Sequence, residues 1–169
     1  MIQMKDDLNK GQALLGAGCF WGVQHYFDQV PGVTGTVVGY TGGDAQNPTY
    51  EMVCSGKTGH AETVSIEFDG QIVDYETLLQ HFFRIHDPTQ INRQGPDIGD
   101  QYRSVIFYTN DAQLQIAQAM IEGKKQAYAM PIATELRPAS AFYPAEEYHQ
   151  KFTQKTGRGA CHVSYHPQG

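Results

Sequence analysis

The sequence predicts an α+β protein, a two-layer sandwich in which helices pack on a mixed, mainly antiparallel sheet and an irregular tail follows at the C-terminus. Strand and helix patterns alternate along the 169 residues, without the regular repetition or the Gly-x-Gly-x-x-Gly fingerprint of a dinucleotide-binding fold. Hydrophobic residues make up 40% and charged residues 18% of the chain, which is typical of globular proteins. Because neither a repeat nor a long linker interrupts the pattern, we expect residues 1–169 to form one domain.

The first strand and helix place a cysteine at their junction. Residues Gln12–Ala17 form an apolar run that stops at a glycine, which predicts a buried strand. Residues Phe20–Val30 carry apolar side chains at helical spacing before Pro31-Gly32 ends the pattern. We therefore expect Cys19 to lie near the N-terminus of a helix.

The middle of the chain continues this alternation. Residues Thr34–Tyr40 predict a strand, and the Gly-, Asn- and Pro-containing stretch 41–49 predicts a loop. A period-two pattern from Val64 to Phe68 predicts a strand with one buried face. Asp74 is placed to cap a helix whose apolar positions are Tyr75, Leu78, Leu79, Phe82 and Phe83.

The C-terminal half contains one more strand and two more predicted helices. Residues Ser104–Tyr108 predict a central strand, and Asn110 with Gln113 resembles a cap for a helix through Ala127. Pro144 is expected to begin a short amphipathic helix to about Gln154. We expect residues 155–169 to form a mobile tail and residues 1–11 to form an N-terminal extension.

Charge and cysteine content exclude several classes of function. The formal net charge of -6, without clustered Lys and Arg, argues against nucleic-acid binding. Residues Met1–Lys10 lack the basic start and apolar run of a secretory signal, and no segment has the length of a membrane span, so we expect a soluble, cytoplasmic protein. Three cysteines without zinc-site spacing predict neither a disulfide scaffold nor a metal site.

Cys19 is the first candidate for chemistry. It stands in Gly18-Cys19-Phe20-Trp21-Gly22, where the glycines allow close backbone approach and a helix end offers N–H groups to a thiolate. Phe20 and Trp21 are suited to hold an uncharged methyl group while excluding water. The alternative is that Cys19 is a small buried hydrophobic residue and that both aromatic rings serve core packing.

Two later stretches supply polar candidates. Glu62 enters a strand beside Ala61, where partial burial would suit it to donate a proton, although a solvated carboxylate is the commoner case. His60 has the chemistry of an acid or base, but we expect it to serve structural hydrogen bonding. Asp97 and Tyr102 are suited to orient a small polar substrate, or else to a turn and to packing.

These stretches together resemble the A class of peptide methionine sulfoxide reductases, the type specific for the S epimer. The resemblance covers the chain from about Ala13 to Cys161 and implies a ferredoxin-like core. It rests on four stretches that occur in order: Gly18–Gly22, Gly39–Gly43, Asn47–Glu62 and Gln94–Ser104.

The resemblance implies a role for each candidate residue. Cys19 is the nucleophile, and Phe20 and Trp21 hold the methyl group of the substrate. Cys161 captures the sulfenic acid left on Cys19, and thioredoxin reduces the resulting disulfide without any bound cofactor. The groups around the sulfoxide oxygen are Glu62, Tyr50 and Tyr102, with Asp97 in the supporting network.

The substrates implied are methionine sulfoxide in oxidised proteins, in peptides and as the free amino acid, and we expect a monomer. The chain departs from common members of the family at Ala160, where a tyrosine often stands. Cys54 is expected to be structural, with resolution of the sulfenic acid as its less favoured role.

Two other classes of function remain open at this point. A hydrolase or amidase would use Cys19 with His60 and Glu62, and would consume no thiol reductant. A non-catalytic module would use Phe20, Trp21 and Tyr50 as an aromatic pocket for methyl-bearing peptides.

Overall fold

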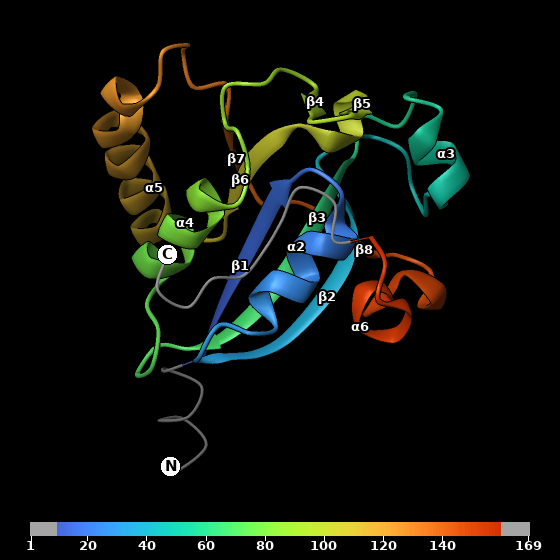
Figure 1. Ribbon diagram of the computed structural model, residues 1–169, viewed down its shortest axis with the longest axis horizontal. Coiled ribbons are helices and arrows are strands. Elements are labelled where there is room, and N and C mark those ends of the chain that lie inside the picture. The colour runs from blue at the N-terminus through green and yellow to red at the C-terminus, as the bar shows by residue number, and fades with distance from the viewer. Residues whose placement is uncertain (1–9, 160–169) are drawn as a thin grey trace.

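The computed structural model describes residues 10–159, and a twisted six-stranded sheet forms their centre (Figure 1). The sheet has the strand order β7-β6-β1-β3-β2-β8. Its strands are β1 (Lys10–Ala17), β2 (Val33–Thr41), β3 (Ala61–Asp69), β6 (Ser104–Tyr108), β7 (Glu135–Pro138) and β8 (Tyr143–Pro144). The helices are α2 (Phe20–Phe27), α3 (Tyr50–Cys54), α4 (Tyr75–Arg84), α5 (Asp111–Lys124) and α6 (Phe152–Thr156).

The central part of the sheet has ferredoxin-like topology. In chain order it comprises β1, α2, β2, β3, α4 and β6, and in space β3 lies between β1 and β2 while β6 lies on the far side of β1. All of these neighbouring strands pair antiparallel, and only the added pair β6 and β7 is parallel. The predicted mixed, mainly antiparallel sheet is therefore confirmed.

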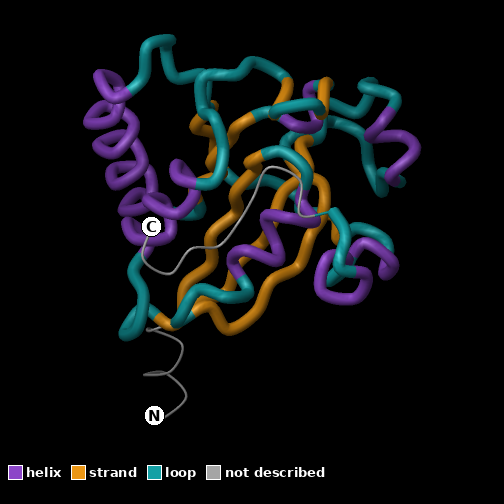
Figure 2. The backbone as a smooth tube through the Cα atoms, in the orientation of Figure 1, coloured by secondary structure: helices purple, strands orange, loops and turns teal. Residues whose placement is uncertain are grey.

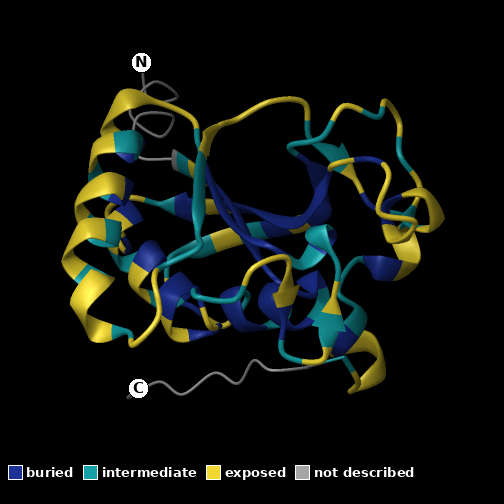
Figure 3. Ribbon diagram, turned by 90° about the horizontal axis from the view of Figure 1, so that it is seen from above, coloured by how far each residue is buried: buried dark blue, intermediate teal, exposed yellow. Residues whose placement is uncertain are grey.

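The two faces of the sheet are covered differently. Ala13 and Leu15 of β1 and Ile66 of β3 belong to the main core cluster, together with the buried faces of α2 and α4. Leu14 and Phe107 point to the opposite face, where Phe142 packs on them. Figure 3 shows the middle of the sheet as largely buried and the outer surface of α5 as exposed. Helices on one face of the sheet make the predicted two-layer sandwich.

The predicted helix caps are present. The Asp74 side chain accepts a 2.8 Å hydrogen bond from the backbone N–H of Thr77, and Asn110 accepts one of 2.9 Å from Gln113. These bonds satisfy N–H groups that have no partner within the helix. Strand β3 differs from the expectation of one buried face, because only Glu67 is exposed along Ala61–Phe68. Cover on both sides of the sheet explains the difference.

The prediction of one helix over 144–154 is wrong. Pro144 ends the short edge strand β8, and a 3₁₀ turn, η3 (Glu147–His149), precedes α6. Lys151 separates the two turns with a left-handed backbone, at φ 58°, which a continuous right-handed helix does not allow. At the other end, β1 begins at Lys10, so the last two residues of the predicted 1–11 extension belong to a strand.

None of the helices between residues 10 and 159 has the length and apolar character needed to cross a membrane. Most of the connection from β2 to β3, and of that from α4 to β6, is loop (Figure 2). Two short strands in the second connection, β4 (Arg93–Gln94) and β5 (Asp97–Ile98), form a hairpin. Both connections lie at the end of the sheet where β1 leads into α2 (Figure 1).

Candidate active site

Cys19 lies at the junction predicted from the sequence. Gly18 turns the chain with φ 95°, a conformation that side chains with a Cβ rarely adopt, and Cys19 is the N-cap of α2. Its side chain accepts no capping hydrogen bond, and the residue is 8% exposed and forms no disulfide within the described chain. The thiol is thus held at a helix N-terminus, where the partial positive charge of the helix favours a thiolate.

Glu62 is brought to this junction by the sheet register. The antiparallel pairing of β1 and β3 runs from Lys10 opposite Asp69 to Leu15 opposite Val64, so the end of β1 lies beside the start of β3. The backbone N–H of Phe20 donates to Oε1 of Glu62 at 3.2 Å, and Glu62 is 2% exposed. A buried carboxyl group therefore contacts the residue directly after Cys19.

Tyr102 approaches from the other side of β1. Strand β6 pairs with β1 so that Ser104 lies opposite Ala17, which places the preceding 3₁₀ turn, η1 (Asp100–Tyr102), at the same edge. Burial is the main cause that raises the pKa of Tyr102 above its ordinary value. The nearby groups that add to this rise are Glu62, Cys54, Asp97 and Cys19. The hydroxyl therefore stays protonated at neutral pH and can donate.

Tyr50 is the first residue of α3, a helix capped by Thr49. Its backbone N–H donates to Oε2 of Glu146 at 3.0 Å. Burial, and then a hydrogen bond with the Cys54 side chain, raise the pKa of the Tyr50 hydroxyl. Charges on Tyr102 and Glu62 act in the same direction, which indicates that these groups face one site.

The aromatic residues after Cys19 form a supported wall. Phe20 is buried, and the Trp21 indole N–H donates to Nδ1 of His149 at 2.9 Å. The Phe152 ring stacks on Trp21 with centroids 4.0 Å apart and planes 18° apart. Burial lowers the pKa of His149, so the ring is neutral at pH 7 and accepts the indole proton. The orientation of Trp21 is thus fixed by groups from the C-terminal part of the chain.

Sequence reasoning missed Glu146, His149 and Phe152. Glu146 accepts from the Tyr40 hydroxyl at 2.9 Å as well as from Tyr50. Burial acts to raise the pKa of Glu146, but the accepted hydrogen bonds outweigh it and hold the pKa below its ordinary value. The signal available was the polar run Glu146–His149 shortly after Pro144, since such a run suits a turn with polar side chains as well as it suits an amphipathic helix.

His60 does not join the site. Its Nδ1 accepts from the backbone N–H of Gly43 at 3.0 Å, and Nε2 lies 2.6 Å from the carbonyl oxygen of Ala45 and donates to it. Both ring nitrogens therefore hold the loop after β2, as the structural expectation required. This arrangement disfavours a hydrolase in which His60 activates Cys19.

Of the other two cysteines, Cys54 lies within the described residues and Cys161 does not. Cys54 is the last residue of α3 and is exposed, and its structural role stays a prediction. Cys161 lies outside the described residues. The chain leading to it is described as far as Gly159, where an added Cβ would lie 2.9 Å from Cε3 of Trp21. The last described residue therefore packs against the aromatic wall beside Cys19.

The sequence profile that describes peptide methionine sulfoxide reductases matches residues 11–169. The chain belongs to the peptide methionine sulfoxide reductase family. The family member named peptide methionine sulfoxide reductase MsrA from Geobacter sulfurreducens is 51% identical over 160 residues, which cover 94% of this chain and 99% of the relative.

Solved structures of family members share the fold. The reduced form of Mxr1 from Saccharomyces cerevisiae has a TM-score of 0.89 at 34% identity, over 95% of this chain and 94% of that one. Mxr1 in complex with Trx2 has a TM-score of 0.63 at 26% identity, over 85% and 86% of the two chains. The ferredoxin-like sheet of this chain is therefore the fold of the family.

Proposed function

We propose that this chain reduces the S epimer of methionine sulfoxide to methionine, in proteins and as the free amino acid, with thioredoxin as the final reductant. The observation that carries the proposal is the hydrogen bond from the Phe20 N–H to Glu62 at the helix N-terminus occupied by Cys19. A thiol, a buried proton donor and an aromatic wall meet there. Membership of the family supports the same reaction.

The first chemical step uses these groups together. The Cys19 sulfur attacks the sulfoxide sulfur while Glu62 gives a proton to the sulfoxide oxygen, which makes the sulfur a better electrophile. Tyr50 and Tyr102 donate hydrogen bonds to the same oxygen without adding charge, and Asp97 supports Tyr102. The oxygen passes to Cys19 as a sulfenic acid, and methionine leaves.

Phe20 and Trp21 hold the methyl group of the substrate. Phe20 is buried, and Trp21 is fixed by its hydrogen bond to His149 and its stacking on Phe152. A rigid apolar wall holds the methyl group in one place and thereby orients the sulfoxide sulfur for attack.

The second step forms a disulfide between Cys19 and Cys161 and releases water. Cys161 follows Gly159 by two residues, and two extended residues span about 7 Å. Gly159, two residues before Cys161 in the sequence, packs against Trp21, and this supports Cys161 as the resolving thiol. Reduced thioredoxin then reduces this disulfide by thiol–disulfide exchange, which restores the thiols of Cys19 and Cys161 and leaves thioredoxin oxidised. The structure of the relative Mxr1 in complex with Trx2 supports thioredoxin as the partner.

The decisive assay supplies the separated S and R epimers with dithiothreitol and measures methionine. The wild-type chain is expected to reduce the S epimer only, and Cys19→Ser is expected to be inactive. Consumption of reductant separates this reaction from hydrolysis, and loss of turnover in Cys19→Ser separates it from a binding module. Reduction of neither epimer would overturn the proposal.

A second assay addresses Cys161. The Cys161→Ser variant is expected to form about one methionine per chain in a single turnover and then to stop with thioredoxin, because no disulfide forms. Full thioredoxin-dependent turnover in that variant would assign resolution to another thiol, with Cys54 as the candidate. The double variant Cys54→Ser/Cys161→Ser then tests that assignment.

A further inference from the structure

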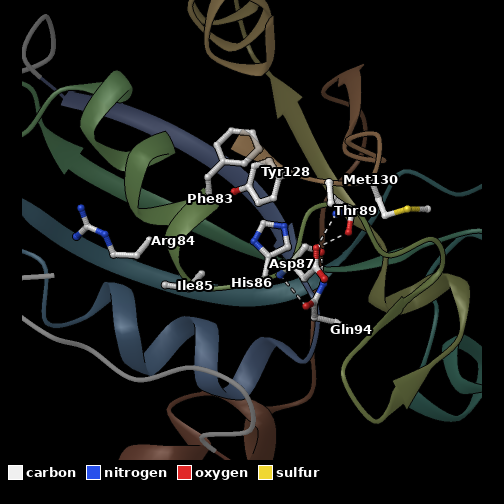
Figure 4. Close-up of a pocket in the computed structure, with 10 residues that line it drawn as sticks. Phe83, Arg84, Ile85, His86, Asp87, Thr89, Gln94, Tyr128 and Met130 are labelled. Carbon is white, nitrogen blue, oxygen red and sulfur yellow. Dashed lines mark hydrogen bonds between the residues drawn. The ribbon is translucent and has the colours of Figure 1, made fainter. Parts of the chain in front are cut away.

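A cavity lies away from the candidate active site. Its volume is about 740 Å³, and it opens between the C-terminal end of α4 and the segment 128–130 that follows α5 (Figure 4). None of the residues proposed for sulfoxide reduction lines it. A volume of this order suits a small ligand or an extended side chain.

The wall of this cavity carries one carboxylate with an available oxygen. Oδ1 of Asp87 accepts from the backbone N–H of Thr89 at 3.0 Å and from its hydroxyl at 2.6 Å. Oδ2 of Asp87 accepts no hydrogen bond from the described residues. The bonds from Thr89 hold the pKa of Asp87 below its ordinary value, so the group is charged at neutral pH.

Two further features favour a cation beside Asp87. The helix α4 ends at Arg84, so its C-terminal carbonyl groups present partial negative charge toward this side. Tyr128 lies close enough for the charge of Asp87 to raise its pKa, after burial as the larger cause. An aromatic ring beside a carboxylate binds alkyl ammonium or guanidinium groups on its face.

Neither Arg84 nor Lys124 occupies the space beside Asp87 and Tyr128. Arg84 is exposed, and its side chain points away from Asp87 and Gln94 (Figure 4). Lys124 places its Nζ 5.6 Å from the centroid of Phe83 and thus occupies that ring instead of Tyr128. The remaining apolar lining comes from Ile85, Ala129 and Met130, which suits the aliphatic stem of a cation.

Hydrogen bonds hold the loop that carries Asp87. The Gln94 side chain accepts from the Asp87 backbone N–H at 2.8 Å and donates to the Asp87 carbonyl at 2.9 Å. The backbone N–H of Ala133 donates to the carbonyl oxygen of Pro88 at 2.7 Å, which ties the two walls together. Because these bonds hold the loop, little ordering is needed when a ligand binds.

We propose that this cavity is a second binding site, which takes an alkyl guanidinium or ammonium group with Asp87 as its counter-ion and with Tyr128 and Met130 around the stem. The group can come from a basic side chain of a polypeptide or from a free small amine. The proposal is independent of sulfoxide reduction, since it uses none of the same residues.

The test is an NMR titration of the full-length ¹⁵N-labelled chain at low salt with butylguanidinium, and with butylurea as its uncharged counterpart. We expect saturable shifts at the amides of 84–94 and 128–130 with butylguanidinium, and binding of butylurea about tenfold weaker. The tripeptide acetyl-Gly-Arg-Gly-amide distinguishes the two sources, because it binds only if the pocket admits a side chain on a backbone.

Asp87→Asn keeps the turn with Thr89 but removes the charge, so it is expected to abolish the preference for butylguanidinium over butylurea. Asp69→Asn is the matched control, since Asp69 also holds a turn, by accepting from the backbone N–H of Gln71 at 2.9 Å. Shifts that do not saturate, equal affinity for the two probes, or the same loss in both variants would overturn the proposal.

Discussion

Replacement of Glu62 by glutamine isolates the proposed proton transfer. The glutamine oxygen can still accept the 3.2 Å hydrogen bond from the Phe20 N–H, and the side chain fills the same buried space. What is lost is the acidic proton. A positioned general acid contributes about 10²- to 10⁴-fold to rate. Because Tyr50 and Tyr102 still hydrogen-bond the oxygen, we expect the lower part of that range.

The expected result is a fall in kcat for the S epimer of about 10²- to 10³-fold, which corresponds to about 3–4 kcal/mol of transition-state stabilisation. KM is expected to change little, because the methyl wall of Phe20 and Trp21 is intact. The assay is steady-state methionine formation over a range of S-epimer concentrations, with dithiothreitol in excess so that recycling does not limit the rate. Urea unfolding of Glu62→Gln checks that the fold is retained.

Glu67→Gln is the matched control, since Glu67 lies on the same strand, β3, and is exposed. It is expected to retain wild-type kcat. Retention of more than about a tenth of wild-type kcat in Glu62→Gln would contradict the role of Glu62 as proton donor, since general acids contribute at least about 10²-fold.

Three further predictions test the surroundings of the site. Cys54→Ser is expected to keep kcat within about twofold, because an exposed hydroxyl can replace the hydrogen bond to Tyr50; steady-state assay with dithiothreitol checks this. Phe152→Ala removes the ring that stacks on Trp21. It is therefore expected to raise KM several-fold and to lower the free energy of unfolding by about 1–2 kcal/mol. An unchanged KM would contradict the role of Phe152 in holding Trp21 against the substrate. Burial lowers the pKa of His149 in the folded chain, so the unfolded chain binds the proton more readily. The free energy of unfolding therefore falls as the pH drops below the ordinary histidine pKa. Urea titrations between pH 8 and 5 are expected to show a weaker pH dependence of this free energy in His149→Gln.

Most of the regular elements were predictable because their signals are local. The caps at Asp74 and Asn110 are made by side chains three residues away, and the apolar spacing of α4 records which side faces the core. The strand-to-helix junction at Cys19 is equally local, since a glycine with positive φ marks it. Short-range hydrogen bonds and periodicity can be inferred without knowledge of the remaining fold.

The segment after β8 failed this kind of inference. Its amphipathic pattern predicts a helix, but Lys151 adopts a left-handed backbone because its side chain forms 2.7 and 2.8 Å hydrogen bonds to Asp28. Gln150 bonds both the N–H and the carbonyl of Val38 on β2. Contacts more than 100 residues apart in sequence thus outweigh local helix preference.

The sequence by itself determined the alternation of elements, the position of Cys19 and the set of side chains from which a reductase site can be made. Only the tertiary structure decided which of them meet. The register of β1 with β3 and β6 brings Glu62 and Tyr102 to Cys19, whereas His60 turns to the loop after β2. Strand register and long-range hydrogen bonds depend on the packing of the entire sheet, so no local pattern specifies them.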